Sequence, residues 1–151
     1  MSVGVPPSRT TSAARARGPL VLIAEGLAEA REQFAVDLVA GGFKVLEAAD
    51  GLAAIEKALR FGPHAIVLDL LLPGADGLEV ARRLRGDPTT SGVAILAVAD
   101  QPVETTEPAA IAAGCDAYMS KPLLGAALVG EIVRLLGARR AAADHHPPER
   151  R

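Results

Sequence analysis

Apolar runs recur along the chain at regular intervals, and they constrain its fold more than any other feature. The five runs lie at residues 20–24, 43–46, 65–72, 93–98 and 117–119. The first, third and fourth are apolar almost throughout, which is typical of strands buried on both faces of a parallel sheet. The second contains Lys44 and is followed by Glu47, a pattern that favours an edge strand. The sequence therefore predicts a parallel sheet of five strands.

Between these runs, apolar residues recur at the three- to four-residue spacing of amphipathic helices. The faces expected to be buried are Ala30, Phe34 and Leu38; Leu52, Ile55 and Leu59; Leu78, Ala81 and Leu84; and Leu128, Ile132, Leu135 and Leu136. A further helix is predicted only over about 108–113, because Pro102 and Pro108 are compatible with a helix start but not with a helix interior. Strict alternation of strands and helices predicts an α/β domain with helices on both faces of the sheet.

Charge divides the chain into a body and two arms. Residues 1–18 carry three arginines and no acid, and residues 139–151 carry four arginines and two acids. Both arms are rich in small and polar residues, so we expect disordered segments at 1–18 and 139–151 around a domain at 19–138. The body has nine basic and sixteen acidic residues. We therefore expect no nucleic-acid partner, which would require a clustered basic face.

Three further observations bear on the class of protein. The single cysteine, Cys115, excludes an internal disulfide and favours a reducing compartment. No apolar run is long enough to span a membrane, and the N-terminal residues lack the apolar stretch of a secretory signal. We therefore expect a cytoplasmic protein with no membrane partner.

Charged residues follow the predicted strands at their carboxyl ends, where ligands bind in open parallel sheets. Glu25 follows the first strand, Asp69 lies late in the third run, Asp100 follows the fourth and Lys121 follows the fifth. Carboxylates beside a lysine suit a hard cation such as Mg²⁺, with the ammonium group free to meet a phosphoryl oxygen.

Two longer motifs carry a family resemblance: VLDLLLPGADG at 67–77 and GCDAYMSKP at 114–122. With these motifs, residues 19–138 resemble the receiver domain of two-component response regulators. The resemblance implies a flavodoxin-like, doubly wound sheet with strand order 2-1-3-4-5 and five helices. It also implies that Asp69 accepts a phosphoryl group from a histidine kinase or a phosphotransfer protein, and that Lys121 contacts this group.

The resemblance implies further roles at the same site. Glu25, Asp69 and the backbone carbonyl of Leu71 would hold Mg²⁺, and Tyr118 would move inward on activation. The bond between Lys121 and Pro122 is a candidate cis peptide, as in the family.

The chain departs from the family pattern at two site positions. Gly26 replaces an acid that binds Mg²⁺ directly, so we expect a weakened metal site. Ala99 replaces a hydroxyl residue that donates to the phosphoryl group, and this leaves room for Tyr118 to lie inward without phosphate. Asp100 would repel a phosphoryl group unless Mg²⁺ draws it in as an accessory ligand.

The leading interpretation is a single-domain response regulator that signals by contact with an unidentified downstream protein. It is not an enzyme beyond self-catalysed phosphotransfer and dephosphorylation at Asp69. A homodimer through the face formed by the fourth helix, fifth strand and fifth helix is compatible with this interpretation. One alternative is a phosphorylation-independent pseudo-receiver that acts as a constitutive interaction module. Another is a small flavodoxin-like enzyme or cofactor-binding protein.

Overall fold

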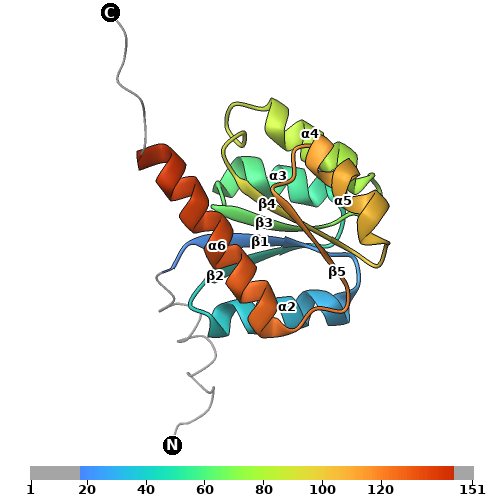
Figure 1. Cartoon of the computed structure of the whole chain (residues 1–151), viewed down its shortest axis with the longest axis horizontal. Helices are drawn as coiled ribbons and strands as arrows, with labels where there is room; N and C mark the ends of the chain where they lie inside the picture. The colour runs from blue at the N-terminus through green and yellow to red at the C-terminus, as the bar shows by residue number, and fades with distance from the viewer. Residues whose placement is uncertain (1–17, 145–151) are drawn as a thin grey trace, which may run out of the picture.

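The predicted apolar runs form one sheet of five parallel strands in the computed structural model, which describes residues 18–144 (Figure 1). The elements in chain order are β1 (Leu20–Ala24), α2 (Ala28–Ala40), β2 (Lys44–Ala48), α3 (Gly51–Phe61), β3 (Ala65–Asp69), α4 (Gly77–Gly86), β4 (Ala94–Ala99), α5 (Val103–Ala112), β5 (Ala117–Ser120) and α6 (Gly125–Asp144). The strand order is β2-β1-β3-β4-β5, which confirms the doubly wound α/β fold. Strand β2 lies at one edge, as its charged residues indicated.

The central strands are buried on both faces because helices cover both sides of the sheet. Helices α2 and α6 lie together on one side, and α3, α4 and α5 lie on the other (Figure 1). Alternate residues of each strand therefore belong to two separate clusters of buried residues. In β1, for example, Val21 and Ile23 face α2 and α6, whereas Leu22 and Ala24 face the other three helices.

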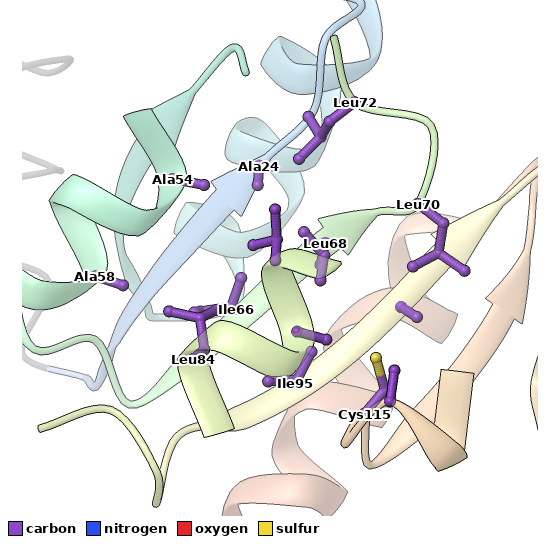
Figure 2. Packing of buried hydrophobic residues seen from close by; sticks show 14 of the residues in the cluster. Ala24, Ala54, Ala58, Ile66, Leu68, Leu70, Leu72, Leu84, Ile95 and Cys115 are labelled. Atoms are coloured by element: carbon purple, nitrogen blue, oxygen red, sulfur yellow. The ribbon is translucent and has the colours of Figure 1, made fainter. Parts of the chain in front are cut away.

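The cluster beneath α3, α4 and α5 combines large strand residues with small helix residues (Figure 2). Ile66, Leu68 and Ile95 point from the strands toward Ala54 and Ala58 of α3 and toward α4. Small helix residues let α3 approach the sheet closely, and protein interiors are packed as densely as crystals of small organic molecules.

This close approach corrects the predicted face of α3. Ala54, Ile55 and Ala58 are buried, whereas Leu52 and Leu59 are exposed. The three- to four-residue spacing was right, but the large leucines lie at the margins of the contact and the alanines lie at its centre.

Helix α5 is longer than predicted because it includes Pro108 in its interior instead of starting there. The helix begins at Val103, with Pro102 at its N-cap position. A proline at 108 cannot donate to the carbonyl of Glu104. Glu104 is exposed, so water can satisfy that carbonyl and the helix tolerates the missing bond.

Helix α6 extends to Asp144, past the boundary expected at residue 138. Arg139 explains part of this extension, because its Nη2 lies 2.6 Å from Oδ1 of Asp116 and so ties the helix to the start of β5. Of the arms expected at 1–18 and 139–151, residues 1–17 and 145–151 lie outside the described residues. No helix among residues 18–144 is long and apolar enough to cross a membrane.

The turn after β3 brings the start of α4 into close contact with the backbone at the end of that strand. Asp76 caps α4 by accepting a hydrogen bond from the Leu78 amide at 3.0 Å. Gly77 then packs on the backbone of β3: a Cβ atom there would lie 2.4 Å from Cα of Leu70 and 2.9 Å from the carbonyl oxygen of Asp69. Only glycine fits this contact, which helps to fix the position of Asp69.

We predict that Gly77→Ala lowers the free energy of unfolding by about 1–3 kcal/mol, because the added methyl group must displace backbone atoms. Urea unfolding followed by circular dichroism measures this change. Gly130→Ala is the matched control: nothing lies within 4 Å of a Cβ atom at this exposed helical position. The control should be as stable as the wild type or up to about 1 kcal/mol more stable. Equal effects of the two substitutions would contradict the proposed close contact.

Candidate functional site

The charged residues singled out in the sequence gather at the carboxyl end of the sheet. Glu25 directly follows β1, Asp69 ends β3 and Lys121 directly follows β5. All three line a pocket of about 670 Å³, together with Gly26, Leu71 and Asp100. Apolar side chains, including Leu27, Phe34 and Leu123, form most of the remaining wall. The structure therefore joins residues that are almost a hundred positions apart.

Lys121 forms ion pairs with both buried carboxylates. Its Nζ lies 2.7 Å from Oε1 of Glu25 and 3.4 Å from Oδ2 of Asp69. Glu25 is completely buried and Asp69 is 5% exposed. Buried charges are costly unless they are paired. Lys121 thus offsets the repulsion between two acids that share one pocket.

Backbone amides hold the other carboxylate oxygens. The Leu27 amide donates to Oε2 of Glu25, and the Leu71 amide donates to Oδ1 of Asp69, each at 3.0 Å. In both cases the donor lies two residues after the acid. The turn that ends each strand therefore also orients its carboxylate.

Arg31 of α2 supports the end of β1, a contact that the sequence did not predict. Its Nη1 donates to the backbone carbonyl of Glu25 at 2.9 Å, and its Nε pairs with Glu47 at 3.1 Å. The one available signal was a basic residue in the first turns of the helix that follows Glu25, which is too common a pattern to single out.

The electrostatics of the site follow from burial and from the ion pairs. Burial raises the pKa of Glu25 by more than the Lys121 ammonium and the Leu27 amide lower it, and the nearby Asp69 adds to the rise. For Lys121, burial lowers the pKa, but Glu25 and Asp69 outweigh this effect and the net pKa is raised. Lys121 is therefore charged at neutral pH.

The oxygen donors of the pocket fit a hard cation, although the pocket has one acid fewer than the family pattern because of Gly26. Two buried carboxylates are present, and Lys121 is the one cationic side chain among the described residues that line the pocket. Among residues 18–144, however, no three His, Cys, Asp or Glu side chains lie close enough to hold a metal together. This pattern agrees with a site of one or two carboxylates completed by water and a backbone carbonyl.

Gly26 packs against the ring of Pro73. A Cβ atom at position 26 would lie 2.7 Å from Cδ and 3.1 Å from Cγ of Pro73. An acid at position 26 therefore requires the proline ring to move. Where the family pattern has an acid, this chain has Gly26, and the ring of Pro73 occupies the space beside it.

Tyr118 lies inward, as the small size of Ala99 allowed. The tyrosine is 8% exposed, and its hydroxyl lies 3.1 Å from the carbonyl oxygen of Ala99 and 2.9 Å from that of Gln101. These contacts join β5 to the segment between β4 and α5. The inward position requires no phosphoryl group on Asp69.

Asp116, within the second sequence motif, has a structural role that the motif did not reveal. Its Oδ2 lies 2.7 Å from Nη2 of Arg85 and accepts the Ile95 amide at 2.8 Å. Arg85 is therefore held against the start of β5, whereas its neighbours Arg82 and Arg83 are exposed. The peptide bond between Lys121 and Pro122 is cis, as the resemblance implied.

Comparisons with known proteins agree with this arrangement. Residues 21–133 match the family model described as the response regulator receiver domain. The chain is 32% identical over 131 residues to the phosphate regulon transcriptional regulatory protein PhoB of Pseudomonas aeruginosa, covering 87% of this chain and 57% of that protein. It is 37% identical over 114 residues to the response regulator MprA of Mycobacterium leprae, covering 76% of this chain and 48% of that protein.

A solved receiver domain is also similar to this chain. The receiver domain of a sensor histidine kinase from Pseudomonas aeruginosa, solved with a magnesium ion coordinated in its active-site cleft, superposes with a TM-score of 0.74. It is 28% identical and covers 80% of this chain and 98% of that domain. The chain spans about half the length of the curated relatives it matches. Because one of them is named a transcriptional regulator, the expectation that nucleic acid is not a partner does not match these relatives.

We predict that Glu25 makes stability depend on pH. A raised pKa in the folded state means that the folded protein holds more protons than the unfolded chain as pH rises above the usual carboxyl range. Stability is therefore lost as pH rises from that range through the raised pKa of Glu25. Urea midpoints between pH 4 and 8 should fall with pH more steeply in the wild type than in Glu25→Gln.

Glu131 provides a control of opposite sign. A hydrogen bond from Arg134 lowers the pKa of Glu131, so its contribution is present above the usual carboxyl range and is lost on acidification. Glu131→Gln should therefore remove a stabilisation that increases with pH. If both variants change the slope in the same direction, the assignment to Glu25 is wrong.

Proposed function

We propose, for a chain that belongs to the response regulator receiver domain family, that Asp69 accepts a phosphoryl group from a histidine kinase or a phosphotransfer protein. Receiver domains are signalling modules, and this chain would pass its signal to a downstream protein by direct contact. The single observation that carries the proposal is the pairing of Asp69 with Lys121 at the carboxyl end of the sheet. A homodimer through the face formed by α5, β5 and α6 belongs to the same proposal.

The proposed reaction is a displacement at phosphorus. A carboxylate oxygen of Asp69 attacks the phosphorus atom, and the bond to the phosphohistidine nitrogen of the donor breaks, with the electron pair staying on that nitrogen. The product is an acyl phosphate on Asp69. Positioning and charge stabilisation account for most of the catalysis in such transfers.

Residues of this chain supply both contributions. The Leu71 amide holds one oxygen of Asp69 and so orients the other. Lys121 already lies between the two acids, and its ammonium group can turn to an oxygen of the incoming phosphoryl group. Glu25, Asp69 and the carbonyl of Leu71 would hold Mg²⁺, whose charge would offset the phosphoryl oxygens.

We predict that the wild type gains one phosphoryl group on incubation with Mg²⁺ and acetyl phosphate, and that Asp69→Asn gains none. Intact mass spectrometry measures the adduct. Asp76→Asn is a matched control, because Asp76 caps α4 and does not line the pocket. An adduct that persists in Asp69→Asn, or no adduct on the wild type with either acetyl phosphate or a panel of kinases, would exclude the proposal.

A second candidate function is a constitutive interaction module that does not depend on phosphorylation. The observation that favours it is the inward Tyr118, whose hydroxyl already bonds the segment after β4. A signalling surface that is already in one conformation gains little from a phosphoryl group, since a ligand shifts an equilibrium only by its differential affinity for the two states.

Intrinsic fluorescence distinguishes the two functions. The sequence contains one tyrosine and no tryptophan, so tyrosine emission reports on position 118 alone. For the constitutive module, we expect quenching by acrylamide to be weak and to stay the same after phosphorylation of Asp69. A clear change in quenching on phosphorylation would show that Tyr118 moves, and would favour the switching receiver.

A further inference from the structure

Asp100 brings an unpaired negative charge to the pocket that holds Asp69. It directly follows β4, it is exposed, and it lines the same pocket as Glu25, Asp69 and Lys121. Its carboxylate has no ion pair or side-chain hydrogen bond to any residue in the described part of the chain. Lys121, the one cationic side chain among the described residues that line the pocket, is already shared by the two buried acids.

The pocket therefore has an excess of negative charge. Three carboxylates face one ammonium group, which gives a formal net charge of minus two. Both buried acids already share the Lys121 ammonium, which lies 2.7 Å from Oε1 of Glu25 and 3.4 Å from Oδ2 of Asp69, so no cationic side chain among the described pocket residues remains to pair with Asp100. Most of the remaining wall is apolar, and a cleft with low-dielectric walls concentrates the field of its charges.

We propose that Asp100 is a specificity-determining residue that selects what enters the pocket by charge. It favours a divalent cation and disfavours a small, freely diffusing phosphodonor, which is itself an anion. The inference rests on the proposed function, since it concerns how the same site distinguishes phosphodonors. The proposed effect comes from the charge of Asp100 in the pocket and requires no direct bond between its carboxylate and the cation.

This role has two consequences of opposite sign. Neutralising Asp100 weakens the attraction for Mg²⁺ and at the same time reduces the repulsion of an anionic donor. A variant that simply misfolds or distorts the pocket would instead lower both the Mg²⁺ affinity and the phosphorylation rate. The opposed signs therefore separate a charge effect from simple damage.

The experiment compares the wild type with Asp100→Asn, which removes the charge and keeps the size of the side chain. Mg²⁺ affinity is measured from shifts of backbone amides near Asp69, and the phosphorylation rate is measured with acetyl phosphate at saturating Mg²⁺. We expect Asp100→Asn to bind Mg²⁺ about three- to tenfold more weakly and to react about three- to tenfold faster at low ionic strength. Both differences should shrink in high salt.

Glu104→Gln is the matched control. Glu104 lies in the first turn of α5, is exposed, carries the same charge and does not line the pocket. Both of its values should stay within twofold of the wild type, because its charge is screened by water and salt. An equal effect of Glu104→Gln would assign the result to the overall charge of the protein and overturn the proposal.

The Mg²⁺ titration keeps this inference separate from the proposed function. If no variant accepts a phosphoryl group but Mg²⁺ affinity still falls in Asp100→Asn, phosphorylation of Asp69 fails while the effect of Asp100 on cations stands. The proposal is overturned if Mg²⁺ affinity is the same in both proteins, if the wild type shows no saturable Mg²⁺ binding, or if Asp100→Asn reacts more slowly with acetyl phosphate.

Discussion

The ammonium group of Lys121 is the contact on which the arrangement of the site depends. Two carboxylates, Glu25 and Asp69, end neighbouring strands and are almost completely buried. Without a cation between them, burial would favour protonation of one acid or separation of the strand ends. Lys121 reaches both acids from the far side of β4, since β5 lies beyond β4 in the sheet. The ion pairs thus connect β1, β3 and the segment after β5.

Much of this arrangement could be predicted from the sequence. The apolar runs predicted the parallel strands, and the two motifs at 67–77 and 114–122 singled out Asp69 and Lys121, which form an ion pair in the structure. These features are local, so a short stretch of sequence specifies them. Pro108 and the leucines of α3 were misread because the outcome depended on exposure to water and on how closely the helix approaches the sheet. Those properties belong to the packed structure and leave no local signal.

The two departures from the family pattern have different physical characters. At Gly26 the ring of Pro73 packs against the backbone and occupies the space that the side chain of an acid would need. Near Ala99, the buried Tyr118 donates its hydroxyl to the backbone carbonyls of Ala99 and Gln101. The hydroxyl group of Tyr118 therefore has hydrogen-bond partners although position 99 carries no hydroxyl. Neighbouring groups thus pack at Gly26 and form hydrogen bonds near Ala99 in the absence of the acid and the hydroxyl of the family pattern.

The attachment of α6 through Arg139 and Asp116 has a practical consequence for handling the protein. Asp116 also accepts the Ile95 amide near the start of β4, so the last turns of α6 are fixed at the amino end of the sheet. The acid pocket lies at the opposite end. A fluorescent protein or an affinity tag joined after residue 144 is therefore attached on the far side of the domain from Asp69. Such a fusion can anchor the protein to a sensor surface and leave the pocket open to a docking kinase.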